Sequence, residues 1–232
     1  MRLSLATRIF IGYAVVLATF GAVSVFSVTE LRRNQIESRL DGEGYLALTQ
    51  ITSAIETFHK NQSQDTARLR DEKNLETRRA LIRLARLYFP GLMSEKLDSG
   101  IATARRVLEF APESERPFLT DVARRFEELK ARYGEYGTTA EAAFLVLDRP
   151  TPELDAANER LDKVQAQETA LGSSIRLLQG SLEARIRERV AQNQERERRT
   201  GVAIIALSVL AIAIGLIATG VAARSLRPVR TL

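Results

Sequence analysis

The sequence predicts an all-α protein, an antiparallel four-helix bundle of long helices that continues into two transmembrane helices. Three observations lead to this prediction. Two long segments, 9–29 and 200–223, contain no charged residue. The segment between them, 30–199, repeats apolar residues at the three- and four-residue spacing of a helix that faces a core. Proline and glycine interrupt this pattern at few places, so the helices are long.

The two uncharged segments are long enough to cross a bilayer. They hold 21 and 24 residues, which at about 1.5 Å per residue gives roughly 31 and 36 Å, against a hydrocarbon thickness of about 30 Å. Neither has the polar face of a helix in a soluble domain. The first is too long for the core of a signal peptide, and helical sequence follows it directly, so a retained anchor is favoured over a cleaved signal.

The distribution of arginine predicts the orientation. No acidic residue lies outside 30–199, but five arginines do: Arg2, Arg8, Arg224, Arg227 and Arg230. They account for the whole net charge of +5 and leave 29 basic and 29 acidic residues in 30–199. Because short, positively charged ends stay in the cytoplasm, we expect cytoplasmic residues at 1–8 and 224–232 and an extracytoplasmic domain at 30–199. The protein would then be a multi-pass membrane protein with both termini in the cytoplasm.

The same charge balance excludes a nucleic-acid partner. The pI of about 9.8 comes from the two ends, and the neutral segment 30–199 has no excess charge to offer phosphates. The sequence has no cysteine, so the domain would fold without a disulfide, as a long helical core allows.

Four helical segments are predicted between the spans. Helix-breaking residues at 71–74, 111–117 and 148–152 divide the chain, and the segments follow as 30–71, 74–110, 115–148 and 153–199. Pro90 and Gly91 fall inside the second segment and predict a kink or a division there. Amphipathic helices joined by short connections favour an up-down-up-down arrangement.

An apolar stripe runs along these segments. It reads Leu48, Ile51, Ile55 and Phe58 in the first, Phe118, Val122, Phe126, Leu129, Tyr133, Tyr136, Ala140, Phe144 and Leu147 in the third, and Leu154, Ala157, Leu161, Val164, Leu171, Ile175, Leu178 and Leu182 in the fourth. The fourth stripe then changes phase: Arg185 and Arg189 occupy its continuation, and Ile186 and Val190 lie one position over. Such a stutter changes the local supercoil.

Two of the stripes become polar at a similar height. In antiparallel helices that leave the membrane at residues 30 and 200, positions at equal height have numbers that add to 230, as those of Gln62 and Glu168 do. Asp65 and His59 each lie within a turn of Gln62. A buried carboxylate needs a partner, so these four residues predict either a ligand pocket or a polar layer that fixes helix register. The pattern favours the register layer, with His59 at a surface or half-buried position.

No catalytic constellation is present in the sequence. There is no glycine-rich phosphate loop, no cysteine, and one histidine without an evident base or orienting partner. We therefore expect no catalytic residue, no cofactor and no metal ion in this segment. A basic face on the second helix, with Arg78, Arg79, Arg83 and Arg86, predicts either a mixed-charge surface or an anion site, and the former is favoured.

The last nine residues resemble the start of a HAMP linker. They read Arg-Ser-Leu-Arg-Pro-Val-Arg-Thr-Leu from Arg224, with a basic residue and a proline directly after the second span. The resemblance implies that Pro228 opens the first signalling helix and that Val229 and Leu232 are core positions of it. The glycines at 42 and 44 are then places where a helix displacement would be absorbed.

Two spans around a helical domain, followed by this linker, resemble the sensor region of a bacterial transmembrane sensor histidine kinase. The resemblance implies a homodimer in the lipid bilayer of the bacterial inner (cytoplasmic) membrane. The dimer would relay a periplasmic or membrane stimulus through the second span to HAMP. A kinase part beyond residue 232 would use ATP and Mg²⁺ and act on a response regulator. The ligand would be a small molecule or a periplasmic protein. Alternatives are the sensor region of a methyl-accepting chemotaxis receptor and a two-pass structural or interaction protein.

Overall fold

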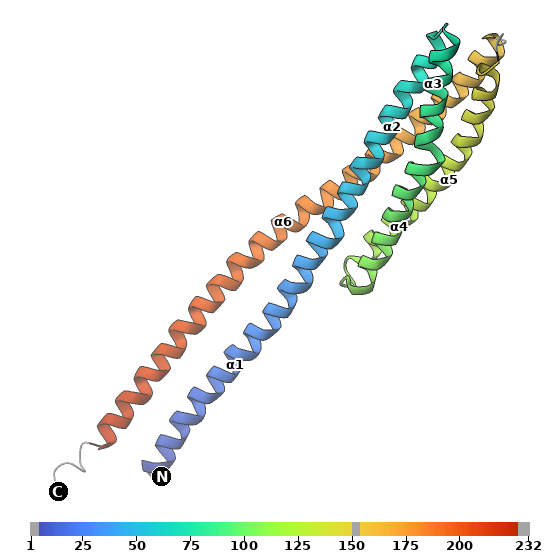
Figure 1. The fold of residues 1–232 in the computed structure, drawn as a ribbon. Helices are drawn as coiled ribbons and strands as arrows, with labels where there is room; N and C mark the ends of the chain where they lie inside the picture. The colour runs from blue at the N-terminus through green and yellow to red at the C-terminus, as the bar shows by residue number, and fades with distance from the viewer. Residues whose placement is uncertain (1–4, 150–153, 227–232) are drawn as a thin grey trace. The chain divides into compact units, whose positions relative to one another are not determined.

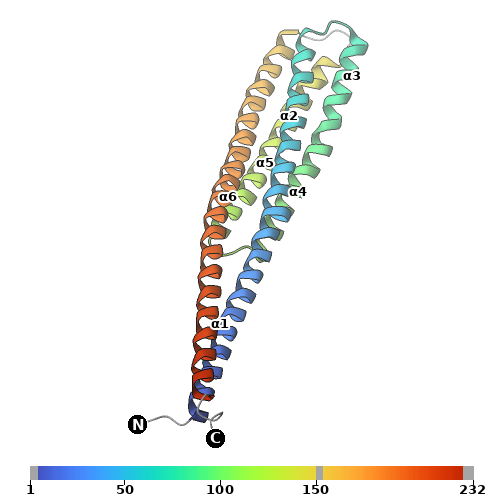
Figure 2. The same cartoon turned by 90° about the vertical axis from the view of Figure 1, so that its left-hand side faces the viewer.

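The computed structural model of the protein describes residues 5–149 and 154–226 (Figures 1 and 2). Apart from short stretches at 72–74, 111–115 and 148–149, these residues are helical, and no strand occurs among them. The prediction of an all-α protein is therefore confirmed. The chain divides into two compact units, one formed by Ile36–Arg187 and the other by Met1–Gln35 together with Glu188–Leu232.

The second of these units contains most of α1 (Leu5–Arg39) and the C-terminal part of α6 (Leu154–Leu226). The Thr200 hydroxyl donates to the Glu30 carboxylate at 3.3 Å. The residues that border the two predicted spans therefore lie at the same height, as the register argument assumed.

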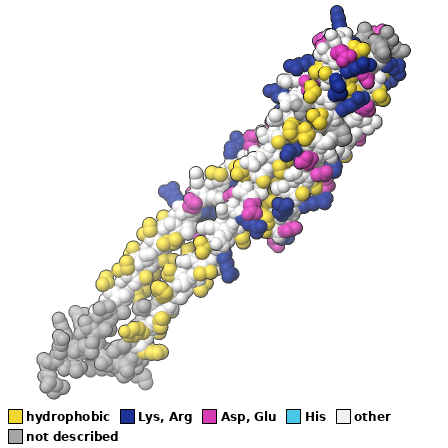
Figure 3. Space-filling view, in the orientation of Figure 1, with side chains coloured by type: hydrophobic (Ala, Val, Ile, Leu, Met, Phe, Trp, Pro, Cys, Tyr) yellow, Lys and Arg dark blue, Asp and Glu magenta, His cyan; other side chains and the backbone are white. Residues whose placement is uncertain are grey.

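One helix is long and apolar enough to cross a membrane, among the residues whose side chains are described. It is α6, in which the most apolar stretch has a mean hydropathy of 2.6 and no buried residue. The first predicted span, 9–29, lies in α1 and includes side chains outside the described residues, so it stays a prediction. Its described apolar side chains are largely exposed, for example Phe10, Leu17 and Phe20. Figure 3 shows hydrophobic side chains gathered along both segments.

The helices of the unit Ile36–Arg187 begin and end where the sequence breaks. α2 (Ala47–Asp71) is followed by α3 (Leu75–Arg86), whose first turn is capped by the Asn74 side chain. The Asn74 carbonyl accepts from the amides of Glu76 at 2.9 Å and Thr77 at 3.2 Å, which satisfies donors that a helix start leaves unpaired. α4 (Met93–Phe110) stops at Ala111, whose extended backbone is the one favoured before a proline. α5 (Arg116–Leu147) then starts with a proline in its first turn.

Two π-helical segments join helices. The first lies within the predicted continuous segment 30–71, and the second lies where Pro90 and Gly91 predict a kink or a division. η1 (Leu40–Leu46) connects α1 to α2 and contains Gly42 and Gly44. η2 (Leu87–Leu92) connects α3 to α4 and contains the Pro90–Gly91 pair. Proline cannot donate the i to i−4 hydrogen bond, and a π-bulge accommodates that loss without ending the helix. The second predicted segment is therefore helical throughout and is not divided at Pro90 and Gly91.

The segments of this unit alternate in direction, with α2, the α3–η2–α4 segment, α5 and the first part of α6 side by side in both views (Figures 1 and 2). Their apolar stripes form one core, and the predicted stripe of the fourth segment is buried from Ala157 to Leu182. Beyond it the burial follows Arg189, which is 8% exposed, whereas Val190 is 51% exposed. Of the two positions predicted to continue the apolar stripe, Ile186 packs against this core, whereas the prediction is wrong for Val190.

The basic face of α3 pairs with α5. The buried Arg78 donates to the Leu147 carbonyl at 3.2 Å, and Arg79 pairs with Asp148 at 3.0 Å. Arg86 forms a two-point pair with Glu141, at 2.6 and 3.0 Å. These arginines fix α3 against the end of α5, as the mixed-charge interpretation expected.

Candidate functional site

The buried stripe of α2 is polar over its second half. Its buried residues are Leu48, Thr52, Ile55, His59, Gln62, Thr66 and Leu69. These positions alternate three and four apart, so the polar side chains occupy the core face of the helix. Asp65 lies beside this stripe, half-buried, and pairs with the exposed Arg68 at 3.6 Å. Thr66 takes the buried position that the sequence analysis gave to Asp65.

Glu168 of α6 faces this part of α2 and is 4% exposed. The Tyr136 hydroxyl of α5 donates to it at 2.8 Å. The hydroxyls of Ser63 and Thr66 lie beside it, and that of Thr66 shares its hydrogen with the Gln62 backbone carbonyl, 3.0 Å away. Burial raises the pKa of Glu168 above that of an ordinary glutamate, and the hydrogen bonds lower it in part. No cation pairs with this carboxylate among the described residues, so hydroxyl groups alone stabilise its charge.

His59 is buried, 9% exposed, so the prediction of a surface or half-buried position is wrong. Its ring has a hydrogen-bond partner on both sides, which compensates for the burial. Its Nδ1 lies 2.8 Å from the Tyr133 hydroxyl, and the ring also hydrogen-bonds to the backbone of Glu168. A backbone carbonyl accepts only, so the ring nitrogen that faces α6 carries the proton and Nδ1 accepts from Tyr133. Burial lowers the pKa of His59, and the nearby Arg176 lowers it further. The imidazole is therefore neutral at physiological pH.

Glycine at position 172 makes room for this ring. A Cβ atom there would lie 2.9 Å from Nε2 of His59, closer than non-bonded atoms approach. Tyr133 and Tyr136, three residues apart on α5, contact each other edge to face with ring centroids 6.1 Å apart. Burial and the negative charge of Glu168 raise the pKa of both tyrosines, so their hydroxyls remain hydrogen-bond donors.

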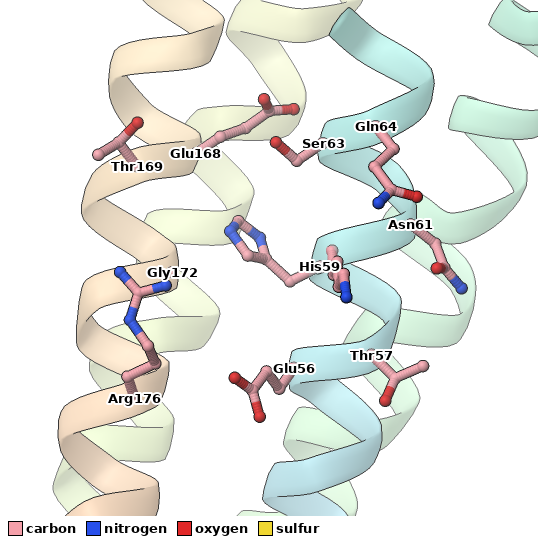
Figure 4. Close-up of a pocket in the computed structure, with 11 residues that line it drawn as sticks. Glu56, Thr57, His59, Asn61, Ser63, Gln64, Glu168, Thr169, Gly172 and Arg176 are labelled. Atoms are coloured by element: carbon pink, nitrogen blue, oxygen red, sulfur yellow. The ribbon is translucent and has the colours of Figure 1, made fainter.

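A groove of about 770 Å³ lies between α2 and α6 above these residues (Figure 4). We call it the α2–α6 groove. His59 and Glu168 form its floor, and its sides carry cationic, anionic, amide and hydroxyl groups from Lys60, Arg176, Glu56, Asn61, Gln64, Thr57 and Thr169. Hydrogen-bond donors and acceptors, both charged and neutral, therefore surround the Glu168 carboxylate. Such a lining is suited to a small polar solute.

The structure thus joins two of the four predicted residues in one network. His59 and Glu168 share the network, and Gln62 is buried one turn from His59 on the opposite side of the α2 stripe, 2% exposed. Asp65 is outside the network. Pro228, Val229 and Leu232 lie outside the described residues, so the HAMP assignment is a prediction.

The sequence analysis missed Tyr133 and Tyr136, which it treated as core residues. The available signal was chemical: two tyrosines occupy neighbouring positions of a stripe in which phenylalanine would serve the packing, and a buried hydroxyl needs a partner. It also missed a second network, in which the Tyr45 hydroxyl donates to Glu115 at 2.6 Å and Arg185 pairs with the same carboxylate at 3.0 Å.

Comparison with known proteins gives this chain no relative: no protein-family model, no curated protein and no solved structure matches it significantly.

Proposed function

We propose that this chain is the signal-input region of a transmembrane sensor, most specifically of a sensor histidine kinase. In this proposal 30–199 is an extracytoplasmic antiparallel four-helix bundle, 9–29 and 200–223 are its two transmembrane helices, and 224–232 begin a HAMP linker. A homodimer would relay a periplasmic or membrane stimulus to a kinase part that binds ATP and Mg²⁺ and phosphorylates a response regulator.

The observation that carries this proposal is the length of α6. This single helix, Leu154–Leu226, includes both Glu168 on the floor of the α2–α6 groove and the apolar stretch long enough for a membrane. A hydrogen-bonded helix resists stretching, so a change at Glu168 would be transmitted along it. A relay also needs two packings of similar energy, and the π-helical η1 on the α1–α2 path is suited to that, since such segments recur at functional sites.

The two glycines of η1 offer a matched test of the relay. A Cβ at Gly44 would lie 3.1 Å from a methyl of Val107, whereas a Cβ at Gly42 would contact nothing. We expect Gly44→Ala to bias the output of a chimera in which residues 1–232 are fused through HAMP to a kinase core, measured as autophosphorylation in membranes. Gly180→Ala, also in open space, is the control for helix propensity. Gly42→Ala is the matched variant within η1. Unchanged output in both Gly44→Ala and Gly42→Ala would refute the relay through η1.

Orientation is tested separately, because the chain has no cysteine and each introduced one is unique. A membrane-impermeant maleimide should label Ser114→Cys, at the exposed α4–α5 connection, in cells with a permeable outer membrane. It should label Ser225→Cys only after the inner membrane is opened. Labelling of both, or of neither, in intact inner membranes would contradict the two-pass topology.

A further inference from the structure

A second hollow, of about 900 Å³, lies on the other side of the two tyrosines. We call it the α5 hollow. Its main lining residues are Gln62 of α2, Ala85 of α3, Leu97 of α4, and Tyr133, Tyr136 and Phe144 of α5. Tyr133 and Tyr136 line this hollow, and their hydroxyls reach His59 and Glu168, which line the α2–α6 groove.

Gln62 is the residue of this hollow that lacks a partner. Its side chain is 2% exposed, and its carbonyl oxygen has no hydrogen-bond partner among the described residues. Buried polar atoms in folded proteins are almost always paired, and leaving one unpaired costs about 1–3 kcal/mol. His59 and Glu168 both have partners: tyrosine and the Glu168 backbone for His59, and tyrosine, serine and threonine hydroxyls for Glu168. The oxygen of Gln62 therefore marks a place that a bound donor would complete.

The other lining residues indicate the polarity and the charge of a ligand that would fit this hollow. Aromatic and aliphatic side chains form most of it. The charged residues there are paired with one another or with neighbours: Arg86 with Glu141 at 2.6 Å, and Lys130 with Asp98 at 2.6 Å. These pairs leave no net charge to attract an ion. Ser94 and Thr138 also line the hollow, and the Thr138 hydroxyl donates to the Gly134 carbonyl at 3.2 Å. A mainly apolar hollow of this size with few polar groups is typical of sites for small neutral molecules.

We propose that the α5 hollow binds a neutral, mainly apolar small molecule through one N–H or O–H group that donates to the side-chain oxygen of Gln62. This site differs from the polar α2–α6 groove in lining and in ligand class. It does not depend on the proposed sensor function, because its test reads binding and no signalling output.

Indole and benzothiophene form a matched pair of probes, since they have the same shape and only indole has an N–H donor. The chain contains no tryptophan, so indole emission reports on the probe alone. With the full chain in nanodiscs, titration of indole fluorescence should saturate. The inhibition constant of benzothiophene, measured by displacement of indole, should be about ten times the dissociation constant of indole. This is the discrimination that one hydrogen bond provides.

Substitution of the anchor should remove this discrimination. In Gln62→Leu the two probes should compete equally, with the affinity for indole reduced about tenfold. Gln64→Leu, on the same helix but lining the α2–α6 groove, should leave the indole affinity unchanged. Loss of an unpaired amide from apolar surroundings is expected to preserve the fold, which circular dichroism checks. If Gln62→Leu does not fold, Gln62→Met replaces it. Absence of saturable binding, equal competition in the unmodified chain, or an effect of Gln64→Leu alone would overturn the proposal.

Discussion

Two buried glutamates in the unit Ile36–Arg187 have different partners. Glu115, at the start of α5, accepts from the Tyr45 hydroxyl at 2.6 Å and pairs with Arg185 at 3.0 Å. Glu168 also accepts from a tyrosine, at 2.8 Å, but its further partners are the hydroxyls of Ser63 and Thr66. The first carboxylate has a cation beside it and the second has none.

This difference separates a structural site from one that can respond to a change. The network of Glu115 joins η1, the start of α5, and α6, and its charges balance. The network of Glu168 is open to the α2–α6 groove, and its carboxyl has a raised pKa. A proton, a cation or a polar solute therefore alters the second network more easily than the first. Each of the following predictions tests that contrast, beginning with the largest effect.

Removal of the cation from the Glu115 network should cost the most. Arg185→Met leaves the Glu115 carboxylate, 5% exposed, with its charge uncompensated, and the free energy of unfolding should fall by about 3 kcal/mol. Denaturation of the full chain in detergent, followed by circular dichroism, measures this loss. Adding Glu115→Gln to Arg185→Met should restore part of it, since a neutral amide needs no cation.

The control is an ion pair of the same helix in solvent. Lys163 and Glu159 are 2.9 Å apart and their side chains are 65% and 73% exposed, so Lys163→Met should cost less than about 0.5 kcal/mol. Equal losses in Arg185→Met and Lys163→Met would show that the Glu115 network contributes no more than a surface pair.

The sequence predicted much of this architecture because its signals are local. Asn74 caps α3, and Pro112 ends α4, at the positions that helix chemistry requires. The three-and-four spacing identified the core face of α6 from Ala157 to Leu182. The register also followed from the sequence, because α1, η1 and α2 follow one another without a break in helical structure, α6 is a single helix, and a residue count measures height along both. Ser63 and Thr66 do meet Glu168, as the count from residues 30 and 200 implied.

What the sequence left open depends on the rotation and height of helices that no count connects. The position of α5 relative to α6 depends on the connection at 148–153, so the pairing of Tyr136 with Glu168 was not predictable. A one-residue error in rotation also exchanged Thr66 for Asp65. The π-helical segments change the phase of a stripe by a fraction of a turn, and glycine or proline marks their place without revealing that the helix continues.

A methyl group at position 172 should destabilise the network of Glu168 and His59. Its Cβ would lie 2.9 Å from Nε2 and 3.3 Å from Cδ2 of His59. The ring cannot move away without breaking its bond to Tyr133, so Gly172→Ala should lower the free energy of unfolding by about 2 kcal/mol. Thermal and urea denaturation of the full chain measure the change.

Gly180, two turns further along the same helix, is the matched control. A Cβ there contacts nothing, so Gly180→Ala should stabilise the chain by up to about 1 kcal/mol through helix propensity. In a His59→Ala background the obstacle is gone, and Gly172→Ala should then behave like Gly180→Ala. A loss at Gly172 that persists in that background would mean that His59 is not the obstacle.

The smallest effect is a slope with pH. Because burial raises the pKa of Glu168, the folded chain binds a proton more tightly than the unfolded chain above the ordinary glutamate pKa of about 4.3. Stability therefore falls as pH rises from there through the folded pKa, by at most about 1.4 kcal/mol per pH unit. Glu168→Gln cannot titrate and should remove this slope, which denaturation across that range measures.

Two other groups titrate with the opposite sign and make the assignment testable. Burial lowers the pKa of His59, so its contribution is complete above about pH 6.5 and is lost as pH falls. Glu159 is exposed, and Lys163 lowers its pKa, so its contribution is also lost as pH falls. The free energy of unfolding of Glu168→Gln minus that of the unmodified chain should therefore increase with pH. The corresponding difference for Glu159→Gln should decrease with pH. The same sign for both would show that Glu168 is as well compensated as a surface carboxylate, and the contrast with Glu115 would lose its basis.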